Sequence, residues 1–183
     1  MATGTVLERP RIGIPPLRDV PVVPALVGVA LSSAYLLLTN PGRDAAVAIP
    51  ALWVLVFLST EDLRRRIIPN RIVVPAWVLA LVLNTWLHPG RAADWIGWSF
   101  GSAFLFLACA LATRGGLGMG DVKLVGFLGA VLGSQVVPAL VIGTSLGAVA
   151  AIAILCREGA AARKRAIAYG PFIAAGGIVT LLL

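Results

Sequence analysis

The chain has 183 residues, of which 59% are hydrophobic and 13% are charged, and its mean hydropathy is +0.95. Globular domains carry about 25% charged residues, so this composition excludes an ordinary soluble domain and indicates an integral membrane protein. The net charge of +7 would suggest nucleic-acid binding in a soluble domain. Here the placement of the basic residues gives a different explanation, and we expect no nucleic-acid partner.

Seven apolar segments follow one another along the chain, most of them close to the roughly 20 residues that cross a bilayer as a helix. They cover residues 21–38, 45–62, 71–88, 95–113, 121–134, 136–156 and 168–183. We therefore predict an all-α, polytopic membrane helix bundle of about six to seven transmembrane helices. Residues 1–20 form a cytoplasmic N-terminal lead, and residues 21–183 form one transmembrane domain. No cleavage site of the secretory type follows the first segment clearly, so it is expected to be retained.

The basic residues indicate the orientation of these segments. If successive segments alternate in direction, every Lys and Arg except Arg43 and Arg91 lies on the same side as the N-terminus. Short loops rich in Lys and Arg stay in the cytoplasm, which predicts a cytoplasmic N-terminus and an external C-terminus. The cluster Arg163-Lys164-Arg165 is also suited to hold anionic lipid.

Two of the eight acids stand out by position. Asp62 ends the second segment and Asp121 begins the fifth, so the alternating topology places both at cytoplasmic helix ends although they are 59 residues apart. Glu61 cannot face the bundle interior together with Asp62, because adjacent helical side chains diverge by about 100°. Two carboxylates held close together share one proton. Such a pair can activate water with one member and donate a proton with the other.

Each acid also has an ordinary structural explanation. Asp121 follows a Gly-rich turn and is placed to cap its helix, while Asp62 is placed to balance the charges of residues 64–66. Charges at the ends of spans are inexpensive. The two acids and the Gly-rich turn together favour a functional site over these separate explanations.

The Gly-rich turn before the fifth segment contains Gly115, Gly116, Gly118 and Gly120. Backbone without Cβ atoms bends freely and allows another chain to approach. The fifth segment is also short for about 30 Å of hydrocarbon, and irregular backbone at membrane depth normally lines a cavity. The turn could therefore hold an extended peptide by strand addition, although a simple connecting loop remains the alternative.

Three sequence motifs resemble those of the type IV prepilin (leader) peptidases. Gly118-Met119-Gly120-Asp121-Val122-Lys123-Leu124 is similar to the GxGD signature of that family. The segment from Asp62 to Asn70 is similar to its first motif, in which an Asp is followed seven positions later by Pro and then by Asn or Asp. Ala168-Tyr169-Gly170-Pro171-Phe172 resembles its Phe-Gly-Pro-Phe segment, with Tyr169 in place of the usual Phe. The likeness runs from about residue 45 to residue 183.

This resemblance implies a function. It implies an aspartic endopeptidase of the cell membrane that removes the short basic leader of prepilins at the cytoplasmic face, with Asp62 and Asp121 as the catalytic residues. Motif-supporting or substrate-binding roles would fall to Gly118, Gly120, Lys123, Pro69 and Asn70. No metal or cofactor is implied for the cleavage. The resemblance leaves open which Asp is the base and what the oligomeric state is.

The chain looks closer to the short peptidases that serve tight-adherence (Flp-type) pili than to the long bifunctional members. The long members carry paired CxxC motifs, which this sequence lacks. Their second activity, N-methylation with S-adenosylmethionine, is therefore not carried over. Cys109 and Cys156 lie inside apolar segments and are expected to be packed thiols rather than metal ligands or a disulfide.

Three motif residues have competing explanations. Lys123 is placed to orient a carboxylate or to contact lipid, and a snorkelling role explains it equally well. Asn70 is expected to cap the third helix, and Pro69 fits a helix entry through its fixed φ.

A different class of function remains open: a small transporter or membrane scaffold in which the two acids couple protons or bind a cation at broken helices. An inverted internal repeat would favour the transporter interpretation, and we find no convincing one. A noncatalytic assembly factor for a pilus system is a further alternative, and the intact acids count against it.

Overall fold

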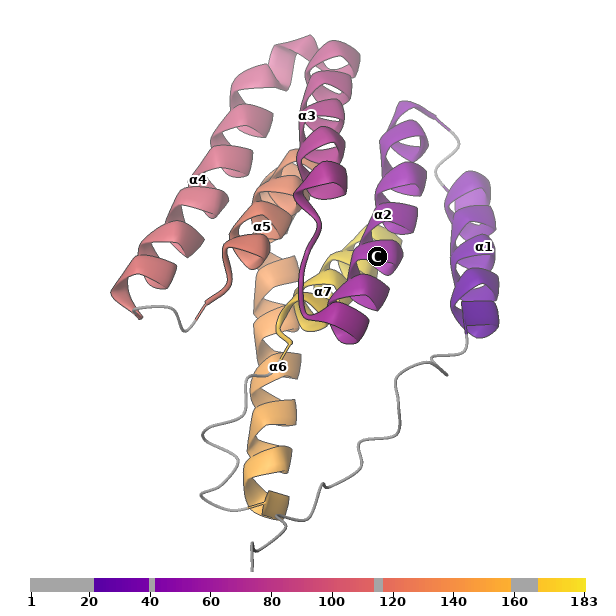
Figure 1. Ribbon diagram of the computed structural model, residues 1–183. Helices are drawn as coiled ribbons and strands as arrows, with labels where there is room; N and C mark the ends of the chain where they lie inside the picture. The colour runs from indigo at the N-terminus through magenta and orange to yellow at the C-terminus, as the bar shows by residue number, and fades with distance from the viewer. Residues whose placement is uncertain (1–21, 40–41, 114–116, 159–167) are drawn as a thin grey trace, which may run out of the picture.

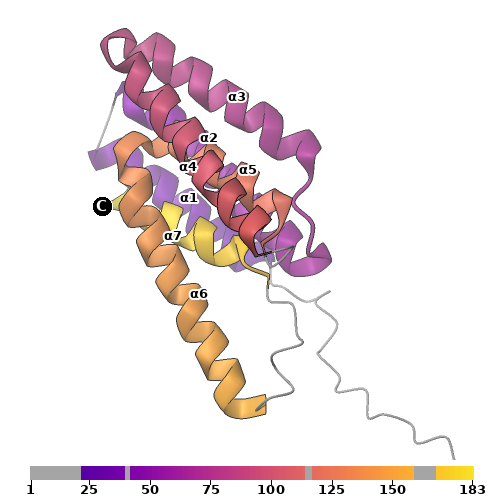
Figure 2. The ribbon, with the colours of Figure 1, turned by 90° about the vertical axis from the view of Figure 1, so that its left-hand side faces the viewer.

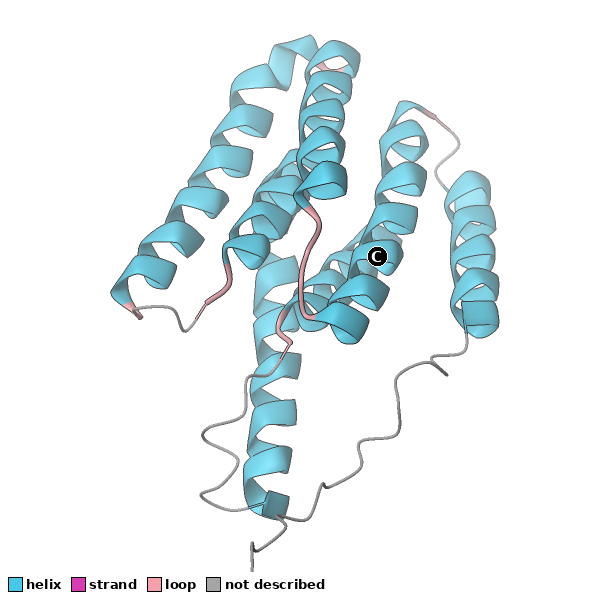
Figure 3. Cartoon of the chain, in the orientation of Figure 1, coloured by secondary structure: helices cyan, strands magenta, loops and turns pink. Residues whose placement is uncertain are grey.

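The computed structural model describes residues 22–39, 42–113, 117–158 and 168–183. Within these ranges every regular element is a helix (Figure 3). The α-helices are α1 (Val22–Thr39), α2 (Arg43–Arg65), α3 (Asn70–Leu87), α4 (Ala92–Ala112), α5 (Met119–Leu132), α6 (Val136–Glu158) and α7 (Gly170–Leu182), with short 3-10 helices η2 (Pro89–Arg91) and η3 (Gly133–Gln135). The predicted all-α architecture is confirmed, and each predicted segment matches one helix to within three residues at either end.

Several of these helices can cross a membrane. Four helical stretches in the described part of the chain are long and apolar enough: Ala45–Arg65, Asn70–Leu87, Pro89–Ala112 and Met119–Arg157, the last of which joins α5 to α6 through η3. The apolar stretches Leu26–Thr39 and Gly170–Leu182 are shorter. At 1.5 Å per residue, the 13 residues of α7 reach only about 20 Å, less than the roughly 30 Å of a hydrocarbon core. The chain is therefore a membrane protein with both full-length and short helices.

The short helix α5 is the centre of the bundle (Figures 1 and 2). It packs mainly against α4, and also against α3 and α7. Every residue from Leu124 to Leu132 is buried, which agrees with a sequence that is apolar around the whole helix. Because neighbours surround α5, its first turn is held in a fixed place.

Hydrogen bonds between helices add to this packing. Trp77 Nε1 of α3 donates to Ser99 Oγ of α4 at 2.6 Å, and Ser99 Oγ donates to the Gly126 carbonyl of α5 at 3.1 Å. Asn84 Nδ2 of α3 donates to the Ala130 carbonyl at 2.7 Å. Such bonds between membrane helices contribute about 0.6 kcal/mol each on average, so they orient α5 more than they stabilise the bundle.

The outward faces of α4 and α6 are apolar and open to lipid. In both views the second half of α6 extends beyond the other helices (Figures 1 and 2). Its side chains include Val149 and Ile152, which are 66% and 60% exposed. Cys109 and Cys156 are exposed on α4 and α6 as well. The expectation that these thiols are packed inside the bundle is therefore wrong, because their helices turn these faces outward.

The site end of the bundle is formed where α2 ends and where α3, α5 and α7 begin (Figure 1). Arg66 terminates α2 in the left-handed region, at φ 54° and ψ 35°, and its N–H donates to the Asp62 carbonyl at 2.8 Å. This conformation is uncommon for a residue other than Gly. It turns the chain into the short connection that leads to α3.

The expected cap of α3 differs from the observed one. Pro69, with φ −70° and ψ 117°, is the boundary residue, and its carbonyl accepts from the N–H groups of Ile72 and Val73 at 3.0 and 3.1 Å. Asn70 is the first residue inside the helix, so its side chain does not cap α3. The capping role expected for Asn70 is wrong because the extended conformation of Pro69 places the helix boundary one residue earlier.

Gly129 tests the contact between α4 and α5. A Cβ atom at this position would lie 2.5 Å from the Trp98 carbonyl oxygen and 2.7 Å from Ser102 Oγ, so we expect Gly129→Ala to destabilise the protein by about 1–3 kcal/mol. The measurement is unfolding in detergent. Gly97→Ala on α4 is the matched control, because a Cβ there meets nothing within 4 Å. Equal stability of the two variants would contradict the close contact.

Candidate active site

The two acids that the sequence singles out meet at the site end of the bundle. They border one cleft of about 330 Å³ between the connection after α2 and the start of α5. Its lining consists of Asp62, Arg66, Ile67, Ile68, Asn70, Gly118, Met119, Gly120, Asp121 and Lys123. Every predicted site residue except Pro69 therefore lines a single cleft.

Both carboxylates are nearly hidden from solvent. Asp62 is 6% exposed and Asp121 is 8% exposed, and the two are close enough for their charges to interact. Ionisable side chains inside a membrane protein are expensive and usually functional. Two buried acids with interacting charges are therefore the strongest chemical feature of the described residues.

Asp62 is held by the last turn of α2 and by the start of α7. The Gly170 N–H faces its carboxylate, and the charge of Arg66 acts on it. A Cβ at Gly170 would lie 2.7 Å from Asp62 Oδ2, so a side chain at this position would push the carboxylate out of its place. Oδ2 is buried and has no hydrogen-bond partner among the described residues. This oxygen is available to a ligand.

The neighbouring acid Glu61 is turned away from the cleft. It forms an ion pair of 3.0 Å with Arg65, one turn further along α2. The prediction that only one of the two adjacent acids faces the interior is confirmed.

Asp121 is held at the N-terminus of α5, three residues after the boundary residue Gly118. The Gly118 N–H faces its carboxylate, and the positive end of the helix dipole stabilises negative charge there. The capping explanation is therefore partly correct. It is incomplete, because the same carboxylate also interacts with Asp62.

Gly120 sets how closely α5 approaches the connection after α2. A Cβ at this position would lie 2.9 Å from Ile68 Cβ, which is closer than real Cβ contacts. The bare glycine allows Asp121 to lie beside Asp62. Gly118 also lines the cleft, whereas Gly115 and Gly116 lie outside the described residues, as does the basic cluster of residues 163–165.

Lys123 and Asn70 form a polar link at the rim of the cleft. Lys123 Nζ donates to Asn70 Oδ1 at 2.7 Å, which joins α5 to α3 across 53 residues of sequence. Lys123 thus binds an amide oxygen in this structure. The bond joins one residue of each of the two acid-containing motifs.

Tyr169 and Gly170 are site residues that our sequence reasoning did not select. Both lie in the motif that opens the last helix, and this motif was the available signal. Gly170 touches Asp62. Tyr169 precedes Gly170 at the start of α7, and burial together with the charge of Asp121 raises the pKa of its hydroxyl.

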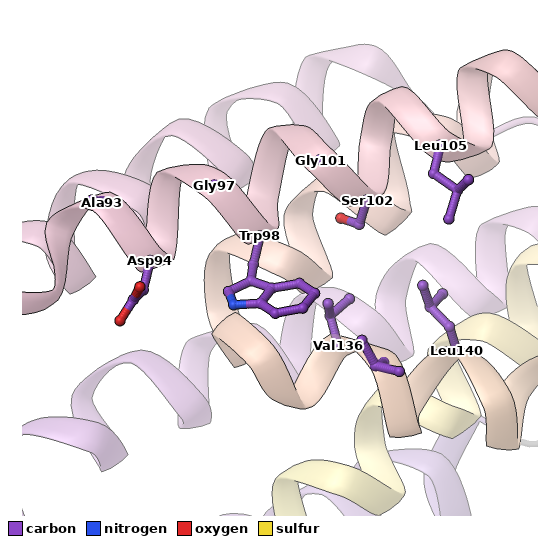
Figure 4. Close-up of a pocket in the computed structure, with 10 residues that line it drawn as sticks. Ala93, Asp94, Gly97, Trp98, Gly101, Ser102, Leu105, Val136 and Leu140 are labelled. Atoms are coloured by element: carbon purple, nitrogen blue, oxygen red, sulfur yellow. The ribbon is translucent and has the colours of Figure 1, made fainter.

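A larger hollow elsewhere is apolar (Figure 4). It lies between α4 and α6, has a volume of about 410 Å³, and shares no lining residue with the acid-lined cleft. Its one acid, Asp94, is exposed and lies 3.7 Å from Arg91. This hollow is larger than the acid-lined cleft, but the paired acids make the smaller cleft the candidate active site.

No group of three or more His, Cys, Asp or Glu side chains in the described ranges could hold a metal ion. The polar side chains of the cleft are two carboxylates, an amide and two basic groups. This set is suited to acid–base chemistry on water or on a peptide.

Comparisons with known proteins give a consistent result. The model of the type IV leader peptidase family matches residues 49–155, a range that includes both acids. The chain is 31% identical over 163 residues to a prepilin leader peptidase/N-methyltransferase of Burkholderia pseudomallei, covering 85% of this chain and 52% of the relative. The proteins of the same name from Aeromonas salmonicida and Bacillus subtilis are 32% and 33% identical, with 86% and 74% of this chain and 56% and 54% of the relatives covered. The chain spans about half the length of these relatives, and no solved structure matches it.

The destabilising effect of the paired acids can be measured as a change in the free energy of unfolding. Asp62→Asn and Asp121→Asn are each expected to raise the free energy of unfolding in detergent at neutral pH by about 1 kcal/mol, as replacements of strained site residues commonly do. At a pH where both carboxylates are ionised, an amide removes the repulsion between their buried charges. The gain should shrink on acidification, because protonated carboxyl groups are neutral as well.

Asp94→Asn is the control for this measurement, since Asp94 is exposed on α4. It should leave stability nearly unchanged at either pH. A loss of stability at neutral pH in both cleft variants would show that the acids are structural groups with satisfied interactions.

Proposed function

Because the chain belongs to the type IV leader peptidase family, we propose that it is an aspartic endopeptidase that removes the short basic leader from prepilins. The observation that carries this proposal is the pair of buried acids, Asp62 and Asp121, in one cleft at one end of the bundle. Their separation in sequence makes a chance meeting of two isolated helix-end charges a poor explanation. The peptidase activity for which the family is named agrees with this geometry.

The pair would act first on water. One ionised carboxylate takes a proton from a water molecule as the water oxygen attacks the carbonyl carbon of the scissile peptide bond. The protonated partner donates to the carbonyl oxygen, which gives a tetrahedral diol. Asp62 Oδ2, which is buried and unpartnered among the described residues, is available for this contact with water or substrate.

The second step would break the carbon–nitrogen bond. The diol returns a proton to the pair as the carbonyl re-forms, and the leaving nitrogen takes a proton from the pair. The new carboxyl and amine ends then separate, and the pair keeps one shared proton. The residues supply every proton transfer, so this reaction requires neither a metal nor a cofactor.

The membrane position would suit a substrate that is half basic and half apolar. The excess of Lys and Arg in the loops on this side of the topology supports a cytoplasmic site in the cell membrane. The basic leader would remain in water, and the apolar helix of the prepilin would remain in the bilayer. The backbone at Gly118, in extended conformation at φ −74° and ψ 141°, could pair with an extended junction peptide.

The proposal extends to the kind of prepilin and to the extent of the activity. We assign prepilins of the type IV or Flp type as substrates, on the basis of the motifs around Asp62 and Asp121, which resemble those of the prepilin peptidases. The methyl transfer that appears in the relatives' names is not assigned to this chain, and S-adenosylmethionine has no part in the cleavage.

The first test is cleavage of a purified prepilin in liposomes. Asp62→Asn and Asp121→Asn should each lower kcat by roughly 10³-fold or more, because each removes a group that transfers a proton in the reaction. Both variants should remain folded. The products are identified by mass spectrometry of the shortened pilin.

Glu61→Gln is the matched control, since this acid is adjacent to Asp62 but pairs with Arg65 outside the cleft. It should cleave at the rate of the unmodified chain. Cleavage that persists in either Asp variant would rule out the paired-acid mechanism. No cleavage by the unmodified chain would favour a transporter or scaffold.

Gly170 gives a sharper geometric test. A methyl group at this position would lie 2.7 Å from Asp62 Oδ2, so Gly170→Ala should displace the carboxylate and lower kcat at least tenfold, as small misplacements of catalytic groups do. Gly101→Ala, where a Cβ meets nothing within 4 Å, should keep full activity. Wild-type kinetics for Gly170→Ala would show that Asp62 does not depend on this contact.

A further inference from the structure

The first turn of α5 carries Asp121 and meets the segment that enters α3 at two neighbouring positions. Gly120 lies against Ile68, where a Cβ would be 2.9 Å from Ile68 Cβ. Lys123 Nζ donates to Asn70 Oδ1 at 2.7 Å. Ile68 is in the connection after α2 and Asn70 is the first residue of α3, so both contacts fall on one short stretch of chain.

The two contacts lie on one face of α5, and Asp121 lies beside that face. Successive residues of an α-helix are rotated by about 100°, so Lys123 is about 60° from Gly120 on one side and Asp121 is about 100° from it on the other. The contact at Gly120 sets how near the helix comes, but a single point does not stop the first turn from rotating. A second contact at Lys123 does. The rotation that it prevents is the one that would displace Asp121.

The hydrogen bond is the directional contact of this turn. On the opposite side of α5, Val122 belongs to an apolar cluster with Ala103 and Ala110 of α4, and apolar contacts are not directional. An ammonium has donors and no acceptor, so Lys123 can bind only the oxygen of the Asn70 amide. The length of 2.7 Å is typical of a charge-assisted hydrogen bond. The bond therefore holds the ammonium at one place on the rim of the cleft.

The position of the bond limits its effect on stability. It is exposed to solvent, and water can replace either partner, so its net contribution to the free energy of unfolding is small. The buried run from Leu124 to Leu132 holds α5 in the bundle without it. The bond should therefore act on the geometry of the first turn more than on the fold.

We propose that Lys123 and Asn70 are positioning residues, whose hydrogen bond fixes the rotation of the first turn of α5 and so holds Asp121 beside the other acid. Both residues line the cleft together with the acid pair. This inference rests on the proposed peptidase function and adds to it the contact that aligns the pair. Lys123 transfers no proton in the reaction, because it acts through Asn70.

Lys123→Met and Asn70→Ala each remove the bond from one side. Each should lower kcat for prepilin cleavage about tenfold, since a small misplacement of a catalytic group slows the reaction, and KM should stay nearly constant. The double variant should also lose about tenfold rather than about a hundredfold, because both changes break the same interaction. Cleavage is measured in liposomes, and unfolding in detergent is measured for each variant.

Asn70→Asp is the conservative variant, because its carboxylate offers an oxygen to the same ammonium. It should keep kcat within about threefold of the unmodified chain. Arg65→Met is the matched control. It removes a cation from the same end of the bundle, but this cation pairs with Glu61 outside the cleft, so full activity is expected.

Inhibitor binding gives a second readout that does not depend on turnover. A peptide isostere with a hydroxyl in place of the attacked carbonyl mimics the tetrahedral diol, and its tight binding requires both acids in position. Its Kd should rise about tenfold in Lys123→Met and in Asn70→Ala. The Kd of a peptide with an uncleavable, N-methylated junction should not change.

Wild-type kcat in Asn70→Ala would overturn the proposal, because this variant keeps the ammonium and loses only its partner. Losses that multiply in the double variant would also overturn it, and so would a rise in KM at constant kcat. A loss of stability with unchanged kcat would show that the bond serves the fold alone. If the unmodified chain fails to cleave prepilin, the proposed function itself is wrong, and this result is distinct from the others.

Discussion

The contact between Gly120 and Ile68 is the constraint on which the site depends. It allows the start of α5 to lie against the connection after α2, at a separation where any Cβ would be 2.9 Å from Ile68 Cβ. Without this approach the two acids would sit on separate helices with no common cleft. The second contact of this kind, Gly170 against Asp62, brings α7 to the same point. Two glycines therefore bring three helices together around two carboxylates.

The rest of the bundle fixes α5 so that this approach is maintained. The helix is buried along nearly its whole length, and its carbonyl groups at Gly126 and Ala130 accept hydrogen bonds from α4 and α3. These polar groups are satisfied, as a low-dielectric interior requires. Asp62 Oδ2 is buried without a partner among the described residues. The Asp62 oxygen thus differs from the carbonyl groups of α5, whose hydrogen bonds are made within the bundle.

Size, burial and chemistry point to different parts of this molecule. The larger hollow between α4 and α6 is apolar. The acid-lined cleft is smaller and polar. In a membrane protein, the location of paired acids is more informative than the volume of a cavity. Ionisable side chains within the bundle cost free energy, and they usually mark a functional site.

The sequence by itself determined the membrane class, the approximate positions of the apolar helices and the two acids, since long apolar runs and isolated charges at their ends are local features. The topology of alternating helices even placed Asp62 and Asp121 at the same end. Only the tertiary structure decided that Gly170 contacts Asp62, that Lys123 binds Asn70, and that Cys109 and Cys156 face outward. Those outcomes depend on how helices rotate and how closely they approach. Rotation and approach are set by packing between segments far apart in the chain, which no local pattern records.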